Sequence, residues 1–311
     1  MIRSLAHEGL IWFDIEHPQK EDVESLAEKY GLHPLNIEDS LSKRQLSKID
    51  DHGNHIFVLY HFPVYTGKNM AIAPSQISFF VGNDFLISIH EPELGSMSRL
   101  FQACEQDPTR RAGVMKSSAR LLYHIADGLV DDLFPFLQKV EENLELISDK
   151  VFDERQSVAV QLSSQRRTIG DLRRIISPLR RLATDSASKL QRFSGHEDLS
   201  EYFDDVTDHV EKAWEILEGT KETIEIYKDT DNILSLELTN KVLVILTIVT
   251  VLTIPATVVG TLYGMNIPMP GSLVPEPATF MGICTTFWIA IAASVLPALA
   301  LLFFFRRRGW L

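Results

Sequence analysis

The sequence predicts an α/β cytosolic domain, followed by a long α-helical stalk and two transmembrane helices. Three observations support this prediction. Strand-like and helix-like segments alternate over the first third of the chain, and long helix-like segments follow. The chain has 311 residues and a formal net charge of −12, yet residues 242–311 contain only Glu276 and the arginines 306–308 as charged groups. A disordered acidic chain is excluded, because 45 % of the residues are hydrophobic.

Residues 1–112 form the predicted α/β domain. Strands are expected at 10–15, 55–62, 75–81 and 85–90, and helices at 19–30 and 95–107. Gly82-Asn83-Asp84 predicts a tight turn between the last two strands, because these residue types favour turns. Cys104 and Cys284 lie far apart and form no CxxC pair, which agrees with a reducing cytosol around this domain.

Residues 113–241 form the predicted helical stalk. Two long helical stretches are expected between about 114 and 194, with a break near 152–154. A third helix is expected to begin near Glu197, after a break at Ser194-Gly195, and to continue into the membrane. A helix of that length needs packing partners, so the pattern favours an oligomeric stalk.

Two uncharged runs predict membrane spans at 242–265 and 278–305. Each is longer than the roughly 20 residues that a helix needs to cross a hydrocarbon core. Lys241 precedes the first span, Arg306, Arg307 and Arg308 open the tail 306–311, and the loop 266–277 has no basic residue. The positive-inside rule therefore predicts a multi-pass protein of the cell membrane with both termini in the cytoplasm.

One stripe of the first span is polar. Its positions advance by alternating threes and fours, as in a helix–helix seam. They are Asn240, Leu243, Thr247, Thr250, Ile254, Thr257, Thr261 and Gly264. Two spans cannot surround a pore, so a channel would require an oligomer in which this stripe faces the axis. In the alternative reading, the threonine hydroxyls bond to carbonyls of their own helix and pack between helices.

The stripe ends in Tyr263-Gly264-Met265-Asn266, at the outer end of the first of two C-terminal spans. This arrangement resembles the CorA family of divalent-cation channels. Further segments resemble the cytosolic part of that family, namely 12–15, 31–35 with Glu38-Asp39, and 76–80. The resemblance implies a homopentameric, funnel-shaped channel in the lipid bilayer that conducts divalent cations. Mg²⁺ is the expected cargo, with Co²⁺, Ni²⁺ or Zn²⁺ as alternatives.

The motif suits a hydrated ion. Mg²⁺ sheds its water reluctantly, and a ring of Asn266 amide oxygens with the Gly264 carbonyl can hydrogen-bond the intact hydration shell. Leu243 and Leu246 are expected to form a hydrophobic constriction farther in. The loop departs from the family, because Gly271-Ser272 stands where many relatives carry an acid. It also lacks the glycine pair typical of the zinc-transporting branch, which favours magnesium.

The resemblance also implies a regulatory cation site between subunits. Tyr202 to His209 (YFDDVTDH) resembles the segment whose aspartates bind that cation. Asp205 and Asp208 are then expected to face Glu38, Asp39 and Asp127 of a neighbouring subunit. Cytosolic Mg²⁺ bound there would hold the channel closed. Asp229 is expected at the inner mouth of the pore, where it would attract cations.

Other functions are less well supported. Arginine doublets at 166/167, 173/174 and 180/181 recur every seven residues, and we interpret them as a solvated or acid-paired helix face. Nucleic-acid binding is disfavoured, because residues 1–241 hold 27 basic and 41 acidic residues, a net of −14. Without nucleotide or hydrolase motifs the chain is not predicted to be an enzyme. His33, His90 and His209 are interpreted as structural or surface groups, and a cation-sensing membrane scaffold is the alternative from another class.

Overall fold

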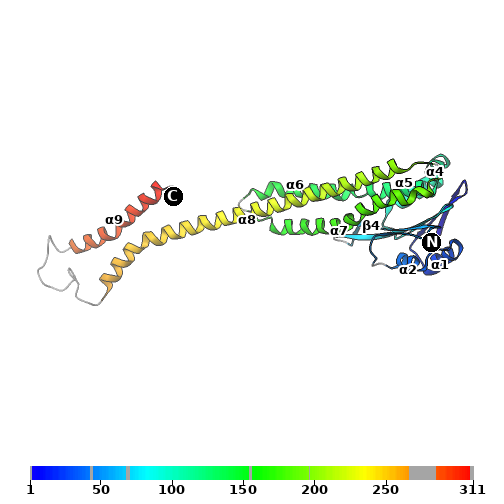
Figure 1. Ribbon diagram of the computed structural model, residues 1–311. Coiled ribbons are helices and arrows are strands. Elements are labelled where there is room, and N and C mark those ends of the chain that lie inside the picture. The colour runs from blue at the N-terminus through cyan, green and yellow to red at the C-terminus, as the bar shows by residue number, and fades with distance from the viewer. Residues whose placement is uncertain are drawn as a thin grey trace. The chain divides into compact units, whose positions relative to one another are not determined.

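Figure 1 shows the computed structural model of the chain, which describes residues 2–42, 45–67, 71–153, 156–195, 197–265 and 285–308. These residues fall into two units, Met1–Thr230 and Asp231–Leu311, which are described in turn. The predicted tight turn, the last two strands and the continuous third helix are all found. The loop 266–277 lies outside the described residues.

The first unit is built on a six-stranded sheet with the order β1-β2-β6-β5-β4-β3. The strands are β1 (Ile2–His7), β2 (Leu10–Glu16), β3 (Lys48–Asp51), β4 (Ile56–Thr66), β5 (Ala71–Val81) and β6 (Phe85–His90). Only β2 and β6 pair in parallel among these strands, and the other neighbours are antiparallel. The edge strands β1 and β3 were not expected, because β3 has only four residues and neither strand carries a run of buried apolar residues.

Both faces of the sheet are buried, because the central strands carry apolar residues at nearly every position. Along β4, Phe57 and Leu59 pack in one cluster with helices α1 (Lys20–Tyr30) and α2 (Pro34–Leu41). The alternating residues Ile56 and Val58 pack in the larger cluster on the opposite face. Figure 1 shows α1 and α2 on one side of the sheet and α5 and α7 on the other. The first unit is therefore a three-layer α/β/α arrangement.

The larger cluster is formed by the remaining helices of this unit. They are α3 (Gly95–Gln106), α4 (Pro108–Val114), α5 (Ser118–Asp131), α6 (Phe134–Val151), α7 (Ala159–Leu190) with the short 3-10 helix η1 (Gln191–Phe193), and the first part of α8 (Ser200–Gly264). The single helix expected from 114 to 152 is wrong, since α5 and α6 are separate. A proline in the first turn of α6 explains the break, because proline is tolerated there but not in a helix interior.

A buried polar network joins β2 to β6 inside this unit. The carboxylate of Asp14, which is fully buried, accepts hydrogen bonds from Ser88 Oγ at 2.7 Å and His90 Nε2 at 3.1 Å. Arg3 on β1 forms an ion pair with the same carboxylate. Burial alone would raise the pKa of Asp14, but these partners hold it below its usual range. The interpretation of His90 as a structural group is thus confirmed.

The second unit contains the C-terminal part of α8 and helix α9 (Thr285–Arg307). Both helices contain stretches long and apolar enough to cross a membrane, within Ser200–Leu262 and Trp288–Arg307. Only 6 % of the most apolar 18-residue segment of each stretch is buried, whereas the core helix of a soluble protein is mostly buried. The exposed apolar surface agrees with the two predicted membrane spans.

Candidate cation sites

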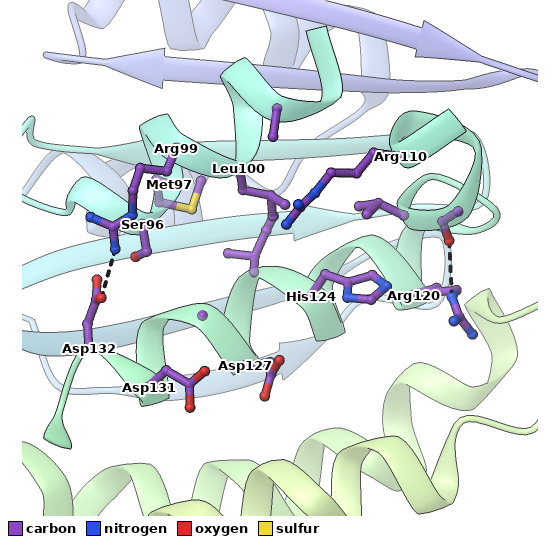
Figure 2. Close-up of a pocket in the computed structure, with 15 residues that line it drawn as sticks. Ser96, Met97, Arg99, Leu100, Arg110, Arg120, His124, Asp127, Asp131 and Asp132 are labelled. Atoms are coloured by element: carbon purple, nitrogen blue, oxygen red, sulfur yellow. Dashed lines mark hydrogen bonds and ion pairs between the residues drawn. The ribbon is translucent and has the colours of Figure 1, made fainter. Parts of the chain in front are cut away.

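An acidic cluster lies between α5 and α8. Asp127 and Asp131 are one turn apart on α5, and His209 on α8 faces them, with one ligand atom of each residue within 4.8 Å of the others. His209 Nδ1 lies 3.8 Å from an Asp131 carboxylate oxygen, and its Nε2 lies 3.9 Å from Asp205. Figure 2 shows Asp127 and Asp131 side by side on the same face of α5. Three groups able to bind a cation therefore converge here, and Asp205 lies beside them.

The electrostatics of this cluster favour a cation. Partial burial, followed by repulsion from the carboxylates of Asp131 and Asp205, raises the pKa of Asp127. A divalent cation would relieve that repulsion. Mg²⁺ takes one or two carboxylates and keeps several waters, and the exposed Asp131 and Asp205 leave room for those waters. The residues present thus fit Mg²⁺, with the His209 imidazole as a further partner for its waters.

Local packing fixes the two helices that carry the cluster. Ser117 caps α5 by accepting a hydrogen bond from the Arg120 backbone N–H at 3.1 Å. The Tyr123 ring on α5 packs against Tyr202 and Phe203 of α8, with ring centroids 5.1 and 6.1 Å apart. Arg120 also forms an ion pair with Glu197, just before α8. These contacts hold Asp127 and Asp205 near each other.

The other predicted ligands lie elsewhere in the chain. Glu38 and Asp39 belong to α2, on the opposite face of the sheet from α5 and α8. The carboxylate of Asp39 lies 2.6 Å from Lys48 Nζ. Asp208 is exposed on α8. One chain therefore brings Asp127 and Asp205 together but not Glu38 and Asp39, whose meeting with a neighbouring subunit stays a prediction.

The sequence reasoning did not identify Asp131 and took His209 for a structural or surface group. The available signal was the four-residue spacing of Asp127 and Asp131, which places both on one helix face. That spacing is common in an acidic chain and carries little weight alone. The partner His209 lies far away in sequence and becomes a neighbour only through the packing of α8 on α5.

The polar stripe of the first span is exposed along its length in the single chain. Its threonine hydroxyls all donate hydrogen bonds to carbonyl oxygens of their own helix. The pairs are Thr247 to Leu243, Thr250 to Leu246, Thr257 to Thr253 and Thr261 to Thr257, with donor–acceptor distances of 2.7 to 2.9 Å. These are the hydrogen bonds expected under the alternative interpretation, in which the threonine hydroxyls bond to carbonyls of their own helix. Each threonine oxygen keeps two lone pairs that can accept hydrogen bonds.

The ends of the spans are partly described. Tyr263 and Gly264 close α8, and the Met265 backbone N–H donates to the Leu262 carbonyl at 3.3 Å. Asn266 lies outside the described residues. Arg306 and Arg307 end α9, and the Arg308 guanidinium lies 5.5 Å from the centre of the Phe304 ring.

The arginine doublets of α7 form ion pairs with α8. Arg166, Arg173 and Arg180 contact Glu225, Glu218 and Glu211, with closest N–O distances of 3.5, 2.7 and 2.7 Å. The interpretation as an acid-paired helix face is therefore confirmed for the first member of each doublet.

Known proteins match this chain in sequence over nearly its whole length. The family described as "CorA-like Mg2+ transporter protein" matches residues 7–307. The "Cobalt/magnesium transport protein CorA" of Thermotoga maritima is 24 % identical over 304 residues, covering 96 % of this chain and 83 % of that protein. A protein of the same name from Methanocaldococcus jannaschii is 22 % identical over 311 residues, covering 97 % of this chain and 92 % of its own length.

Solved structures share the fold. The complete CorA magnesium transporter of Methanocaldococcus jannaschii superposes with a TM-score of 0.80 at 21 % identity, covering 99 % of this chain and 94 % of that one. The ZntB cytoplasmic domain of Vibrio parahaemolyticus gives a TM-score of 0.58 at 16 % identity, covering 73 % of this chain and 88 % of the domain. The predicted fold class, an α/β domain with a helical stalk and two C-terminal membrane helices, is confirmed.

Proposed function

The chain belongs to the family of CorA-like Mg²⁺ transporters, and we propose that it is a passive Mg²⁺ channel that is closed by cytosolic Mg²⁺. As a member of this family it is a membrane transporter of divalent cations rather than an enzyme. The proposal specifies which ion is transported, the path that the ion takes through the protein, and how the channel is closed. Hydrated Mg²⁺ moves into the cytosol down its electrochemical gradient through a homopentamer in the cell membrane.

The bonding of the threonine stripe is the observation that carries this proposal. A hydrated Mg²⁺ presents water hydrogens outward, so the pore wall must supply acceptors. Thr247, Thr250, Thr257 and Thr261 have each committed their hydroxyl hydrogen to a helix carbonyl. The lone pairs that remain can accept hydrogen bonds from the water shell. Both interpretations of the stripe can therefore hold together. The hydrogen bond within the helix uses the hydroxyl hydrogen, which leaves the oxygen to accept hydrogen bonds from the water shell of the ion.

The stripe requires an oligomer to become a pore. Its residues are exposed in the single chain, including Leu243 at 52 % and Ile254 at 50 %. Five copies around an axis would cover this surface and leave α9 to the lipid. Leu243 and Leu246 would then form the constriction that gates by dewetting, and Asn240 would face the water shell below it.

The mouth of the pore is assigned to Tyr263, Gly264, Met265 and Asn266. Neutral oxygens at this end can select a hydrated ion by size and dipole orientation without removing its waters. At the inner end, Asp229 is exposed on α8 and can attract cations. Two charges moving into a negative cytosol gain about 4.6 kcal/mol per 100 mV, so no coupled energy source is needed.

Control is assigned to the acidic cluster. Mg²⁺ held by Asp127 and Asp205, with Asp208 and the Glu38-Asp39 pair of a neighbouring subunit, would join carboxylates that otherwise repel each other. Binding that favours the closed arrangement must, by linkage, weaken when the channel opens. The basic residues Arg306, Arg307 and Arg308 are assigned to the cytoplasmic side, together with both termini.

The test is uptake into proteoliposomes that contain a Mg²⁺-sensitive dye and hold a negative-inside potential. We expect Mg²⁺ uptake by the parent protein and at least tenfold slower uptake by Asn266→Ala. Asn232→Ala, an exposed position of α8 off the stripe, is the matched control and should keep the parent rate. Parent-like uptake by Asn266→Ala would contradict the assigned filter.

The same liposomes discriminate the alternatives. Zn²⁺, Co²⁺ or Ni²⁺ uptake without Mg²⁺ uptake would reassign the cargo, and a dependence on a pH gradient would add proton coupling. The cobalt in the name of the Thermotoga maritima relative makes Co²⁺ the first of these to measure. A protein that assembles but conducts none of these ions would support the scaffold function instead.

A further inference from the structure

A cavity of about 780 Å³ lies beside the acidic cluster, between α3, α4 and α5. Its floor is apolar, with Met97, Leu100 and Ile125 among the lining residues. Figure 2 shows Arg110 reaching from α4 toward His124 on α5, with Asp127 and Asp131 side by side farther along α5, on the side away from Arg110. The volume lies within the range of small-molecule sites, roughly 300–1,000 Å³. The cavity is larger than a single hydrated cation needs.

One end of the cavity is cationic. Arg110 lines it and makes no ion pair or hydrogen bond within the described part of the chain. Arg120 also lines the cavity, but its guanidinium already forms an ion pair with Glu197 and a hydrogen bond to the Gly113 carbonyl at 3.2 Å. A free guanidinium presents a planar fork of donors that matches the oxygens of a phosphate group. Arg110 is therefore available for an anion, whereas Arg120 contributes mainly its charge.

The positive charges at this end of the cavity affect the pKa of His124. Burial first, and then the charges of Arg120 and Arg110, lowers the pKa of His124 to about 4. The imidazole is therefore neutral at cytosolic pH and retains one N–H that can donate to an anion. Arg110 and His124 together provide donors from two different helices.

The other end of the cavity is acidic. Asp127 and Asp131 line it, and the neighbouring Asp132 is already bound by Arg99 at 2.9 Å. His124 and Asp127 are three residues apart on one face of α5, which corresponds to about 5 Å along the helix axis. One ligand can therefore place an anionic group on the first and a cation on the second.

We propose that this cavity binds a phosphate-bearing anion together with its own Mg²⁺, with the phosphate on Arg110 and His124 and the cation on Asp127 and Asp131. The inference rests on the proposed function only in taking Asp127 as a cation ligand, to which it adds Asp131. The chain carries a net charge of −12, so a polyphosphate without its cation is repelled. The proposal concerns binding alone, and the sequence contains no GxxxxGK(S/T) motif.

Isothermal titration of the full-length protein in detergent micelles tests the proposal, with Mg·ATP and magnesium tripolyphosphate as probes. We expect saturable binding that weakens about tenfold or more in Arg110→Gln, because a charge-assisted hydrogen bond is lost. Arg111→Gln is the matched control, since Arg111 is on the same helix but does not line the cavity. Asp131→Asn should weaken Mg·ATP binding, whereas it should not weaken any residual binding of ATP in EDTA, because the variant removes a negative charge.

The outcomes separate the ligand sources and the two proposals. Equal affinity for both probes would assign the site to the polyphosphate chain, and tighter Mg·ATP binding would assign it to a nucleotide seated on the apolar floor. Parent affinity in Arg110→Gln, or affinity that does not depend on Mg²⁺, would overturn the inference. Mg²⁺ uptake without binding of either probe would overturn this inference alone, whereas binding of a probe without uptake of any cation would overturn the transport proposal alone.

Discussion

Arg180 of α7 binds Glu211 of α8 in a two-contact ion pair, with Nε–Oε1 and terminal N–Oε2 distances of 2.8 and 2.7 Å. Seven residues earlier on α7, Arg173 pairs with Glu218, seven residues later on α8. Both guanidinium groups lie about 5 Å from the centre of the Trp214 ring. Two antiparallel helices are thus joined by a charge ladder that repeats with the helical period.

The ion pairs between α7 and α8 should each make a modest contribution to the free energy of unfolding, and this contribution can be measured for one pair at a time. Arg180→Ala should lower the free energy of unfolding by about 1 kcal/mol, through the lost ion pair and the lost stacking on Trp214. A double-mutant cycle with Glu211→Ala should return a coupling of about 0.5 kcal/mol, because both side chains are more than a third exposed. Arg181→Ala, the exposed second member of the doublet, should change little. Equal effects of the two arginine variants would contradict the assignment.

Asp14 is predicted to be a key stabilising residue of the sheet. Asp14→Ala leaves Arg3 and the buried His90 without their shared carboxylate, which costs about 3–5 kcal/mol for a broken buried pair. We expect a fall in the thermal midpoint of more than 5 °C by circular dichroism. The control is Asp149→Ala, at an exposed position of α6. A parent-like midpoint for Asp14→Ala would show that the network contributes no net stability.

His55 predicts how stability depends on pH. It is 99 % buried, stacks on His52 with centroids 5.0 Å apart, and has its pKa lowered to about 4 by burial and then by His52 and His33. The unfolded chain therefore binds more protons than the folded one between pH 6.5 and 4. Stability should fall as the pH drops through that window, by up to about 3 kcal/mol from this residue.

The measurement is the thermal midpoint at a series of pH values for the parent and for His55→Gln. The variant should lose part of the acid sensitivity, whatever its midpoint at pH 7. His17→Gln is the matched control, because His17 is exposed and its ring nitrogen lies 3.1 Å from a carboxylate oxygen of Glu91. Curves of identical pH dependence for His55→Gln and the parent would exclude His55 as the source.

Removal of a carboxylate from the acidic cluster should weaken the inhibition of Mg²⁺ uptake by internal Mg²⁺. Asp205→Ala should raise the internal Mg²⁺ needed for half-maximal block of uptake by about tenfold, because one carboxylate of the site is removed. Asp131→Asn should act in the same direction. Asp204→Ala is the control, since this exposed neighbour lies outside the cluster. Unchanged block in both cluster variants would sink the regulatory assignment while leaving transport intact.

Local patterns were sufficient for most of the fold. The strand 85–90 could be predicted because five apolar or small residues and a histidine follow a turn, and the spans because uncharged runs of that length have few alternatives. The division between α5 and α6 was missed, although Pro135 marks it. The pairing of Asp131 with His209 was inaccessible, since it depends on how α8 packs against α5 rather than on any local pattern.

The threonine stripe gives the sharpest test of the pore. Thr257 donates its hydroxyl hydrogen to the Thr253 carbonyl at 2.9 Å and keeps two lone pairs that can accept hydrogen bonds. Thr257→Val keeps the shape but removes those acceptors, so Mg²⁺ uptake should fall about fivefold, the equivalent of one hydrogen bond of about 1 kcal/mol. Thr257→Ser keeps the oxygen and should restore most of the rate. Thr253 makes the same kind of internal bond but lies off the stripe, so Thr253→Val should conduct like the parent. A loss of uptake in Thr253→Val equal to that in Thr257→Val would mean that the threonines serve helix packing and that the water shell of the ion does not contact them.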